Sequence, residues 1–537
     1  MGIRVPRISI SADYGEESAL GDINTLSIGY GLHQAWIYAA MFGTGTIFGA
    51  PTISATAQTP VTPVFFISIA VYAVCLLIAG FTDRKLLNIY VSKKTLVFAA
   101  LLTSVGTLAA LGAGTSGTIG LVATIFAGVA TGVGSALLLL FWGTAFSRHE
   151  SASIVVNTGV ALVVAIFIYS LVLHHLPYPI AGILTACLPL AEMVLLWKLT
   201  PVPYTKRHEV PIFTQLNIKR GIFALRFCIP VFIFGYALGS LRETSIQGVL
   251  PGADISDQLI MLLAAGIATI LILITVFALG KAGRWSFLFR PLIPFIAVAV
   301  FLLPFSGGES LALADLVLLV AYLCFEALMW IFFGELSQGL RLSPVFVFGL
   351  GRGSLGIGAL VGSTVSLNTD FLAMLPFGDS GAAIVILLAM VIAYSLLPRE
   401  KDIREIVLPT SQLARDEVAK INAMGFDRIE AASATNAQTA TYDATAVSEG
   451  SPEHDAKPKG GGFFKARCEA VADHYLLSRR ETEVMFLLAK GHNSAFIQER
   501  LFISEGTAKT HIRHIYKKLD IHNQQDLMRI VDEQRVD

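Results

Sequence analysis

The feature that most constrains this chain is a series of long apolar segments along roughly its first 400 residues. A helix needs roughly 20 apolar residues to cross the hydrocarbon core of a bilayer, and about twelve segments reach that length. Lipid offers the backbone no hydrogen-bond partners, so only helices and closed barrels span it, and these segments are far longer than barrel strands. They predict a bundle of about twelve transmembrane helices, with approximate spans at 27–49, 62–81, 95–113, 119–146, 152–174, 178–198, 221–241, 258–280, 286–305, 311–335, 344–366 and 380–398.

Composition agrees with residence in lipid, because 54% of the residues are hydrophobic and only 15% are charged. The chain has five cysteines, and their spacing fits neither a disulfide framework nor a metal site. We expect no metal and no cofactor. Since no nucleophile with a base and no phosphate-binding loop stands out either, we expect that the protein is not an enzyme.

The orientation follows from the basic residues, which concentrate on the cytoplasmic side of membrane proteins. If residues 1–26 form a cytoplasmic N-terminal segment, the inward loops hold nearly all of the Lys and Arg residues and the outward loops hold only Arg242. This asymmetry predicts a multi-pass protein of the cytoplasmic membrane with both termini in the cytoplasm. The membrane domain is expected at residues 27–398.

The longest internal loop, residues 199–219, divides the predicted spans into two groups of six. The stretch from Gly80 to Lys85, GFTDRK, lies between the second and third spans. This layout resembles the major facilitator superfamily, in which an Asp and an Arg in that loop brace neighbouring helix ends. The glycine and basic residues expected after Asp83 and Arg84 are missing, so the resemblance implies the architecture more than transport.

Ionisable side chains within the spans are candidates for a ligand site, since each costs about 2.5–3.5 kcal/mol at mid-bilayer and needs a partner or a purpose. Such residues are His33, Glu192, Arg226, Glu326 and Arg352. Glu326 and Arg352 either form an ion pair between adjacent helices or line a ligand cavity, and with His33 they are the candidate ligand-binding residues. Arg226, near a helix start, is expected to reach the cytoplasmic face.

The eleventh span contains GLGRGSLGIG, from Gly349 to Gly358. It matches a nucleotide-binding string only in its letters, because no strand precedes it and it lies at membrane depth. Small residues that recur every two to four positions favour close helix packing. We expect close packing, or a pliable helix that bends around a cavity.

Residues 399–465 are expected to be a linker that is first partly helical and then flexible, because Ala, Thr, Ser, Asp, Pro and Gly dominate its second part. Residues 466–537 form a second predicted domain of four helices. Ser478 and Glu481 make a capping box that opens the first, which Gly491 ends. The others span about Ser494–Leu501, Glu505–Leu519, capped by Ser504, and Gln524–Val531.

Two short helices joined by a tight turn, the second of them basic, are typical of a helix-turn-helix that places its second helix in the major groove. The stretch LSRRETEVMFLLAKGHNSAFIQERLFISEGTAKTHIRHIYKKLDI resembles the LuxR-type family closely, at positions that include Leu477, Glu481, Gly491, Lys509 and His511. The whole chain is thus expected to be all-α: a membrane helix bundle followed by a four-helix LuxR-type domain.

The resemblance implies roles for individual residues. Lys509, Thr510 and Arg513 would contact base edges, and Ser504, Thr507 and Lys518 would contact phosphates. In the family the fourth helix pairs two subunits, so Leu527 and Ile530 are the candidate dimerisation residues. Gln524 stands where arginine is common in the family, which implies the loss of a phosphate or capping contact.

The leading hypothesis is a one-component transcription regulator of the bacterial inner membrane. Its membrane domain would sense an unknown small molecule or a membrane signal, and its cytoplasmic domain would bind double-stranded promoter DNA as a homodimer. The alternative is a secondary transporter of the major facilitator type with a DNA-binding appendage. A third hypothesis makes the bundle a mere tether.

Overall fold

The computed structural model describes residues 8–12, 18–23, 25–42, 61–113, 115, 117–147, 149, 151–199, 220–243, 255–279, 312–339, 342–367, 381–396, 461–475, 477–501 and 505–534. These residues divide into two units, one with the helices before residue 400 and one with those after residue 460. Each unit is described by itself.

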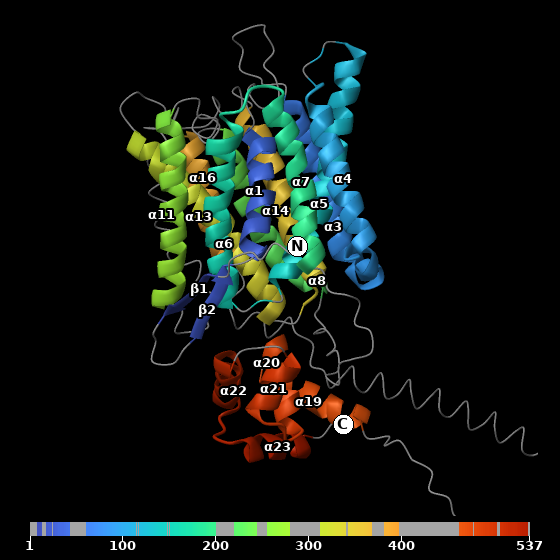
Figure 1. Ribbon diagram of the computed structural model, residues 1–537, viewed down its shortest axis with the longest axis vertical. Helices are drawn as coiled ribbons and strands as arrows, with labels where there is room; N and C mark the ends of the chain where they lie inside the picture. The colour runs from blue at the N-terminus through green and yellow to red at the C-terminus, as the bar shows by residue number, and fades with distance from the viewer. Residues whose placement is uncertain are drawn as a thin grey trace, which may run out of the picture. The chain divides into compact units, whose positions relative to one another are not determined.

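The first unit is a bundle of long helices that run alongside one another (Figure 1). Its helices before residue 200 are α1 (Thr25–Phe42), α3 (Val61–Tyr90), α4 (Lys93–Ala110), α5 (Thr118–Phe146), α6 (Ser151–Ile166), extended by the π-helical η1 (Phe167–Leu173), and α7 (Ile180–Leu199). Those after residue 219 are α8 (Arg220–Phe223), the π-helical η2 (Ala224–Cys228), α9 (Ile229–Leu241), α11 (Ile255–Leu279), α13 (Ala312–Gly339), α14 (Pro344–Leu367) and α16 (Gly381–Leu396).

Within the described residues, eight helices are long and apolar enough to cross a membrane, and two shorter apolar helices accompany them. The helical membrane domain is therefore confirmed, whereas the count of about twelve stays a prediction. The predicted span at 286–305 lies outside the described residues, as does the dividing loop from residue 200 to 219.

Two local features differ from the sequence-based expectation. A short antiparallel hairpin, β1 (Ile8–Ala12) with β2 (Ser18–Ile23), precedes α1. Among the described residues, the other regular elements are all helices. The expected loop around Gly80–Lys85 is part of α3, which continues to Tyr90 because no proline interrupts it. The chain breaks only at Ser92, whose hydroxyl accepts a hydrogen bond from the Thr95 amide at 3.1 Å and so caps α4.

The glycines of α14 bring its backbone against two other helices. On one side, a Cβ added to Gly349 would lie 2.7 Å from the Leu76 carbonyl oxygen of α3. On the other side, a Cβ at Gly358 would collide with the Phe232 carbonyl oxygen of α9. The close packing expected of this glycine-rich string is thus confirmed, and α14 is held between α3 and α9.

Hydrogen bonds add to the contact between α9 and α14. The Ser240 hydroxyl donates to the Gly362 carbonyl oxygen at 3.3 Å, and the Ser363 hydroxyl donates to the Gly239 carbonyl oxygen at 3.2 Å. These reciprocal bonds form because the absence of side chains at the two glycines lets the backbones approach. They fix the register of the two helices without any charged group.

We expect Gly358→Ala to destabilise the membrane unit by about 1–3 kcal/mol, because the new methyl group overpacks the α9–α14 contact. The measurement is the thermal unfolding of the full chain in detergent. Gly266→Ala in α11 is the matched control, since a Cβ there meets nothing within 4 Å. Equal unfolding temperatures for the two variants would contradict the backbone contact.

The described residues of the second unit form five helices, where the sequence predicts four after residue 465: α19 (Gly461–His474), α20 (Arg479–Ala489), α21 (Ser494–Leu501), α22 (Glu505–Leu519) and α23 (Gln524–Glu533). The additional helix α19 lies partly in the stretch that we expected to be linker. Its two initial glycines favour a loop, but Cys468, Val471 and Ala472 are fully buried and Phe464 packs beside them. Their i, i+4, i+7, i+8 spacing was the signal for this helix.

Candidate DNA-binding surface and membrane cavity

Glu481 links the helices of the second unit. Its side chain accepts a hydrogen bond from the Ser478 amide at 2.7 Å, while the Ser478 hydroxyl caps the Glu481 amide, so the expected capping box is present. The Lys518 ammonium of α22 lies 2.6 Å from the same carboxylate. Glu481 is only 5% exposed, and this set of donors compensates the burial of its charge.

The pair α21–α22 forms the helix-turn-helix, with α22 as the second helix. Ala508, Ile515 and Leu519 of α22 are buried in the core of the unit. The opposite face carries Lys509 and Arg513, both exposed, with Thr510 half-buried beside them. This separation of apolar and cationic faces presents positive charge to the exterior, as a helix that enters a DNA groove requires.

For two of the residues predicted to contact phosphates, the structure does not describe the side chain. Ser504 lies outside the described residues, and Thr507 lies in α22 with a side chain that is not described. Lys509 also pairs with Glu505 at 2.9 Å, so DNA would have to compete with that carboxylate. Lys518 already serves Glu481, which makes its first role the joining of α20 to α22.

His514 of α22 lies close to the cations Arg513 and Lys518. Partial burial lowers the pKa of His514, and Arg513, His511 and Lys518 lower it further, against an opposite effect of Glu481. The imidazole of His514 is therefore neutral at pH 7 and gains its charge only in more acid solution.

Two other sequence-based interpretations change. Leu527 is fully buried in the core of the unit and Ile530 is half-buried against it, so Leu527 does not offer its side chain to a second subunit. The exposed apolar side chain of α23 is Met528. Gln524 does keep a capping contact, because its amide donates to the carbonyl oxygens of Leu488 at 2.8 Å and His492 at 3.0 Å.

We expect Lys509→Ala and Arg513→Ala each to weaken binding of duplex DNA, and the double variant to lose at least about tenfold in affinity and to bind with a shallower salt dependence. The measurement is fluorescence anisotropy at several salt concentrations. Arg529→Ala on α23 is the control, since Arg529 and Lys509 are equally exposed, at 67%. Affinity unchanged in the double variant would rule out this face of α22.

Glu481 predicts the acid sensitivity of the second unit. Its burial alone would raise the pKa, but the Lys518 ammonium and the hydrogen bonds from Lys518 and Ser478 hold it below the usual 4.5. The stabilisation is therefore present above about pH 4.5 and is lost as the pH falls through the lowered pKa.

We expect Glu481→Gln to cost about 1–3 kcal/mol at neutral pH, because the buried contacts to a charged group weaken, and to flatten the decline of stability in acid. Urea unfolding of residues 461–537 between pH 3 and pH 7 measures both effects. The exposed Glu533→Gln should change neither. An unchanged pH profile in Glu481→Gln would count against this role.

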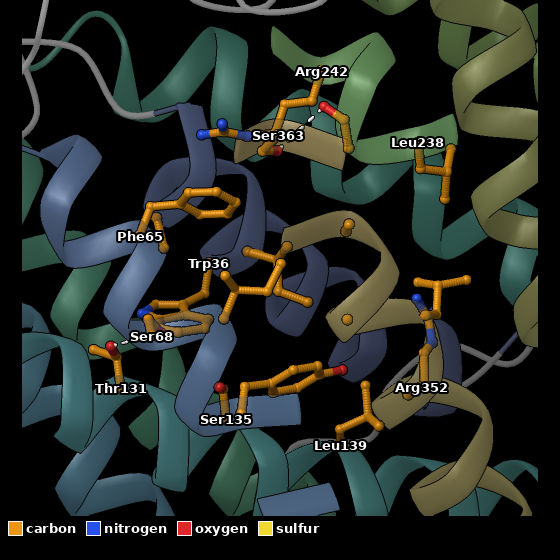
Figure 2. A pocket seen from close by; sticks show the side chains of 18 of the residues that line it. Trp36, Phe65, Ser68, Thr131, Ser135, Leu139, Leu238, Arg242, Arg352 and Ser363 are labelled. Atoms are coloured by element: carbon orange, nitrogen blue, oxygen red, sulfur yellow. Dashed lines mark hydrogen bonds between the residues drawn. The ribbon is translucent and has the colours of Figure 1, made fainter. Parts of the chain in front are cut away.

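In the first unit, a cavity of about 150 Å³ lies among α1, α3, α4, α5, α9, α13 and α14, so helices from both predicted groups of six line it. Its wall is mainly apolar and aromatic, with Trp36, Phe65, Tyr72 and Tyr322 among its residues. Ser68 and Thr131, joined by a hydrogen bond of 2.9 Å, border it on the side of α3 and α5 (Figure 2).

Glu326 and Arg352, which the sequence singled out, both line this cavity. They act on each other electrostatically, but the structure gives no ion pair between them within 4 Å, so the interpretation as a direct pair is not supported. Glu326 instead accepts a hydrogen bond from the Tyr38 hydroxyl at 3.2 Å. The Arg352 guanidinium lies over the Trp330 ring, 5.3 Å from its centroid.

Sequence reasoning missed Arg242, which it placed in an outward loop. Arg242 follows α9, is 3% exposed and lines the cavity. Its guanidinium is paired with Glu243 and lies 3.7 Å from the centroid of the Phe65 ring. The signal in the sequence was that Arg242 is the one basic residue in the predicted outward loops. It therefore departs from the rule that basic residues lie on the cytoplasmic side.

His33 is not among the residues that line the cavity. Its Nδ1 atom lies 3.0 Å from the Glu192 carboxylate, which also accepts a hydrogen bond from the Trp142 indole at 3.2 Å. His33 and Glu192, two of the polar candidates within the spans, thus pair with each other between α1 and α7 through Nδ1 of His33. The cavity has Glu326, Arg352 and Arg242 as its charged groups.

Comparison with known proteins identifies the second unit. Residues 475–531 match the family of bacterial regulatory proteins, luxR family. Residues of the chain are 38% identical over 78 residues to the transcriptional regulatory protein LiaR of Bacillus subtilis, and 42% identical over 53 residues to the oxygen regulatory protein NreC of Staphylococcus haemolyticus. The matched residues are 14% and 10% of this chain, and 37% and 24% of those proteins. The C-terminal unit is therefore a LuxR-type DNA-binding domain.

Solved structures resemble the first unit. The human organic anion transporter MFSD10 aligns with 70% of this chain and 98% of its own, at 14% identity and a TM-score of 0.47. A bacterial homologue of the iron transporter ferroportin aligns with 70% of this chain and 97% of its own, at 20% identity and a TM-score of 0.46. These likenesses concern the arrangement of helices alone.

Proposed function

We propose that this protein is a one-component transcription regulator of the bacterial inner membrane, in which a ligand bound within the helix bundle controls DNA binding by the C-terminal domain. The observation that carries the proposal is the presence, in one chain, of a LuxR-type domain and a membrane domain with a cavity that contains charged side chains. Both termini lie in the cytoplasm in this proposal, since the DNA-binding domain must reach DNA and the basic residues favour that side.

The cavity supports sensing because helices of both predicted groups of six line it. A ligand in such a place contacts both groups at once and favours the arrangement in which its contacts are better. The α9–α14 contact includes glycine backbones and two reciprocal serine hydrogen bonds. In this proposal a shift between the two helices breaks these bonds, and promoter binding as a homodimer reports the shift.

The alternative function is a secondary transporter with a regulatory appendage. The same cavity would serve as its substrate site, at the interface of two helix groups. The alternative requires substrate flux, which proteoliposomes that contain the purified chain would measure. A bare tether is the third hypothesis, in which the cavity has no role in regulation.

The test uses a chimera in which an unrelated membrane anchor, with its C-terminus in the cytoplasm, replaces residues 1–398. Genome-wide binding of the intact chain identifies a target promoter, and a reporter under that promoter measures regulation. We expect the chimera to bind its promoters. The ratio between its highest and lowest reporter activity should fall at least about tenfold, because no ligand-dependent element remains. A chimera that regulates like the intact chain would establish the tether instead. Lys509→Ala with Arg513→Ala in the intact chain is the control for loss of DNA binding itself.

A further inference from the structure

Arg352 is a buried cation in the cavity wall, and two of its hydrogen-bond donors have no acceptor among the described residues. Its side chain is 6% exposed, and its Nε and Nη2 atoms have no hydrogen-bond partner among the described residues. Tyr30, Tyr72 and Glu326 are the ionisable groups that act on it electrostatically, and the Trp330 ring covers one face. The guanidinium also has a hydrogen bond with the Tyr30 side chain. A ligand that supplies acceptors for the two remaining donors is favoured, because a buried charge is compensated only when its donors are paired.

The two unpaired atoms define the shape of the missing partner. Nε and Nη2 are neighbours on one edge of the guanidinium, and their N–H bonds point in the same direction. This fork matches the two oxygens of a carboxylate, which accept two parallel hydrogen bonds. A neutral carbonyl group would satisfy only one of the two donors and would leave the positive charge uncompensated.

The other charges of the cavity are already matched. Arg242 is paired with Glu243 and stacked on Phe65, and the Glu326 carboxylate accepts a hydrogen bond from Tyr38. Glu326 repels an anion, yet it has its own donor and makes no direct ion pair with Arg352. Arg352 has no carboxylate within ion-pair distance among the described residues and has two buried donors on one edge, so it is the group that we expect to select an anionic ligand.

The size and lining of the cavity specify the rest of the ligand. A dry cavity of about 150 Å³ holds a molecule of the size of benzene, and this cavity has about that volume. Trp36, Phe65 and Tyr72 supply apolar and aromatic surface, and Figure 2 shows Arg352 at one side of the same space. The apolar body thus has the size of one ring or a short alkyl chain.

We propose that the cavity binds a small monocarboxylic acid, with the carboxylate on Nε and Nη2 of Arg352 and the apolar body against Trp36, Phe65 and Tyr72. Binding of the acid is a property of the membrane unit alone. Only its effect on promoter binding rests on the proposed sensing function. Glu326 then weakens the site by repulsion and limits it to ligands whose apolar body contributes to binding.

The first experiment measures equilibrium binding to the full chain in nanodiscs. The probes are phenylacetate and hexanoate, and for each the neutral amide and the cationic amine with the same body. We expect both carboxylates to bind at least about tenfold more tightly than their amides and amines, which corresponds to one charge-assisted contact. Equal binding of the three charge types, or no saturable binding of either carboxylate, would overturn the proposal without any variant.

Substitutions then locate the site. Arg352→Gln should abolish carboxylate selectivity, and Arg352→Lys, which keeps the charge but loses the fork, should weaken it. Glu326→Gln should tighten carboxylate binding. The matched control is Arg226→Gln, because Arg226 is an exposed arginine of η2 outside the cavity. Selectivity that survives in a folded Arg352→Gln protein would place the anion elsewhere.

The promoter reporter separates this proposal from the proposed function. Carboxylate binding that depends on Arg352 without any change of the reporter would retain the site and reject ligand-controlled regulation. A reporter that responds to these acids in the intact chain and equally in Arg352→Gln would retain regulation and reject the site.

Discussion

The membrane unit depends on how closely α14 approaches its neighbours. Its backbone touches α3 through Gly349 and α9 through Gly358, and any side chain at either position would separate the helices. Lipid gives helices no hydrophobic reason to associate, so close backbone packing has to supply the attraction. Since Arg352 lies between these two contacts in the sequence, the same packing fixes where its guanidinium sits in the cavity wall.

The two units differ in how they compensate a buried charge. Glu481 is surrounded by donors from Ser478 and Lys518, so it holds helices together and needs nothing more. Arg352 is equally buried, but two of its donors have no acceptor among the described residues. In our proposal a carboxylate ligand completes these two donors and so compensates the cost of their burial.

Sequence reasoning found both candidate sites but not all of their members. It selected Glu326 and Arg352 because an ionisable residue in a span is costly, and Lys509 and Arg513 because they lie on one face of α22. It missed Arg242, because a residue at the end of a predicted span cannot be distinguished from a residue of the following loop. It also assigned Leu527 to an interface, because a family pattern does not reveal which side of α23 the core of this particular chain covers.

Local pattern and composition are enough to predict the helical membrane unit, the capping box, the helix-turn-helix and the cationic face of α22. These follow from periodicity, length and neighbouring residues, which the chain order contains. The folded chain was needed to find that His33 pairs with Glu192, that Lys518 binds Glu481, and that Arg352 lines a cavity with two donors unpartnered among the described residues. Each of these depends on residues far apart in the chain, whose meeting is set by helix packing rather than by any single segment.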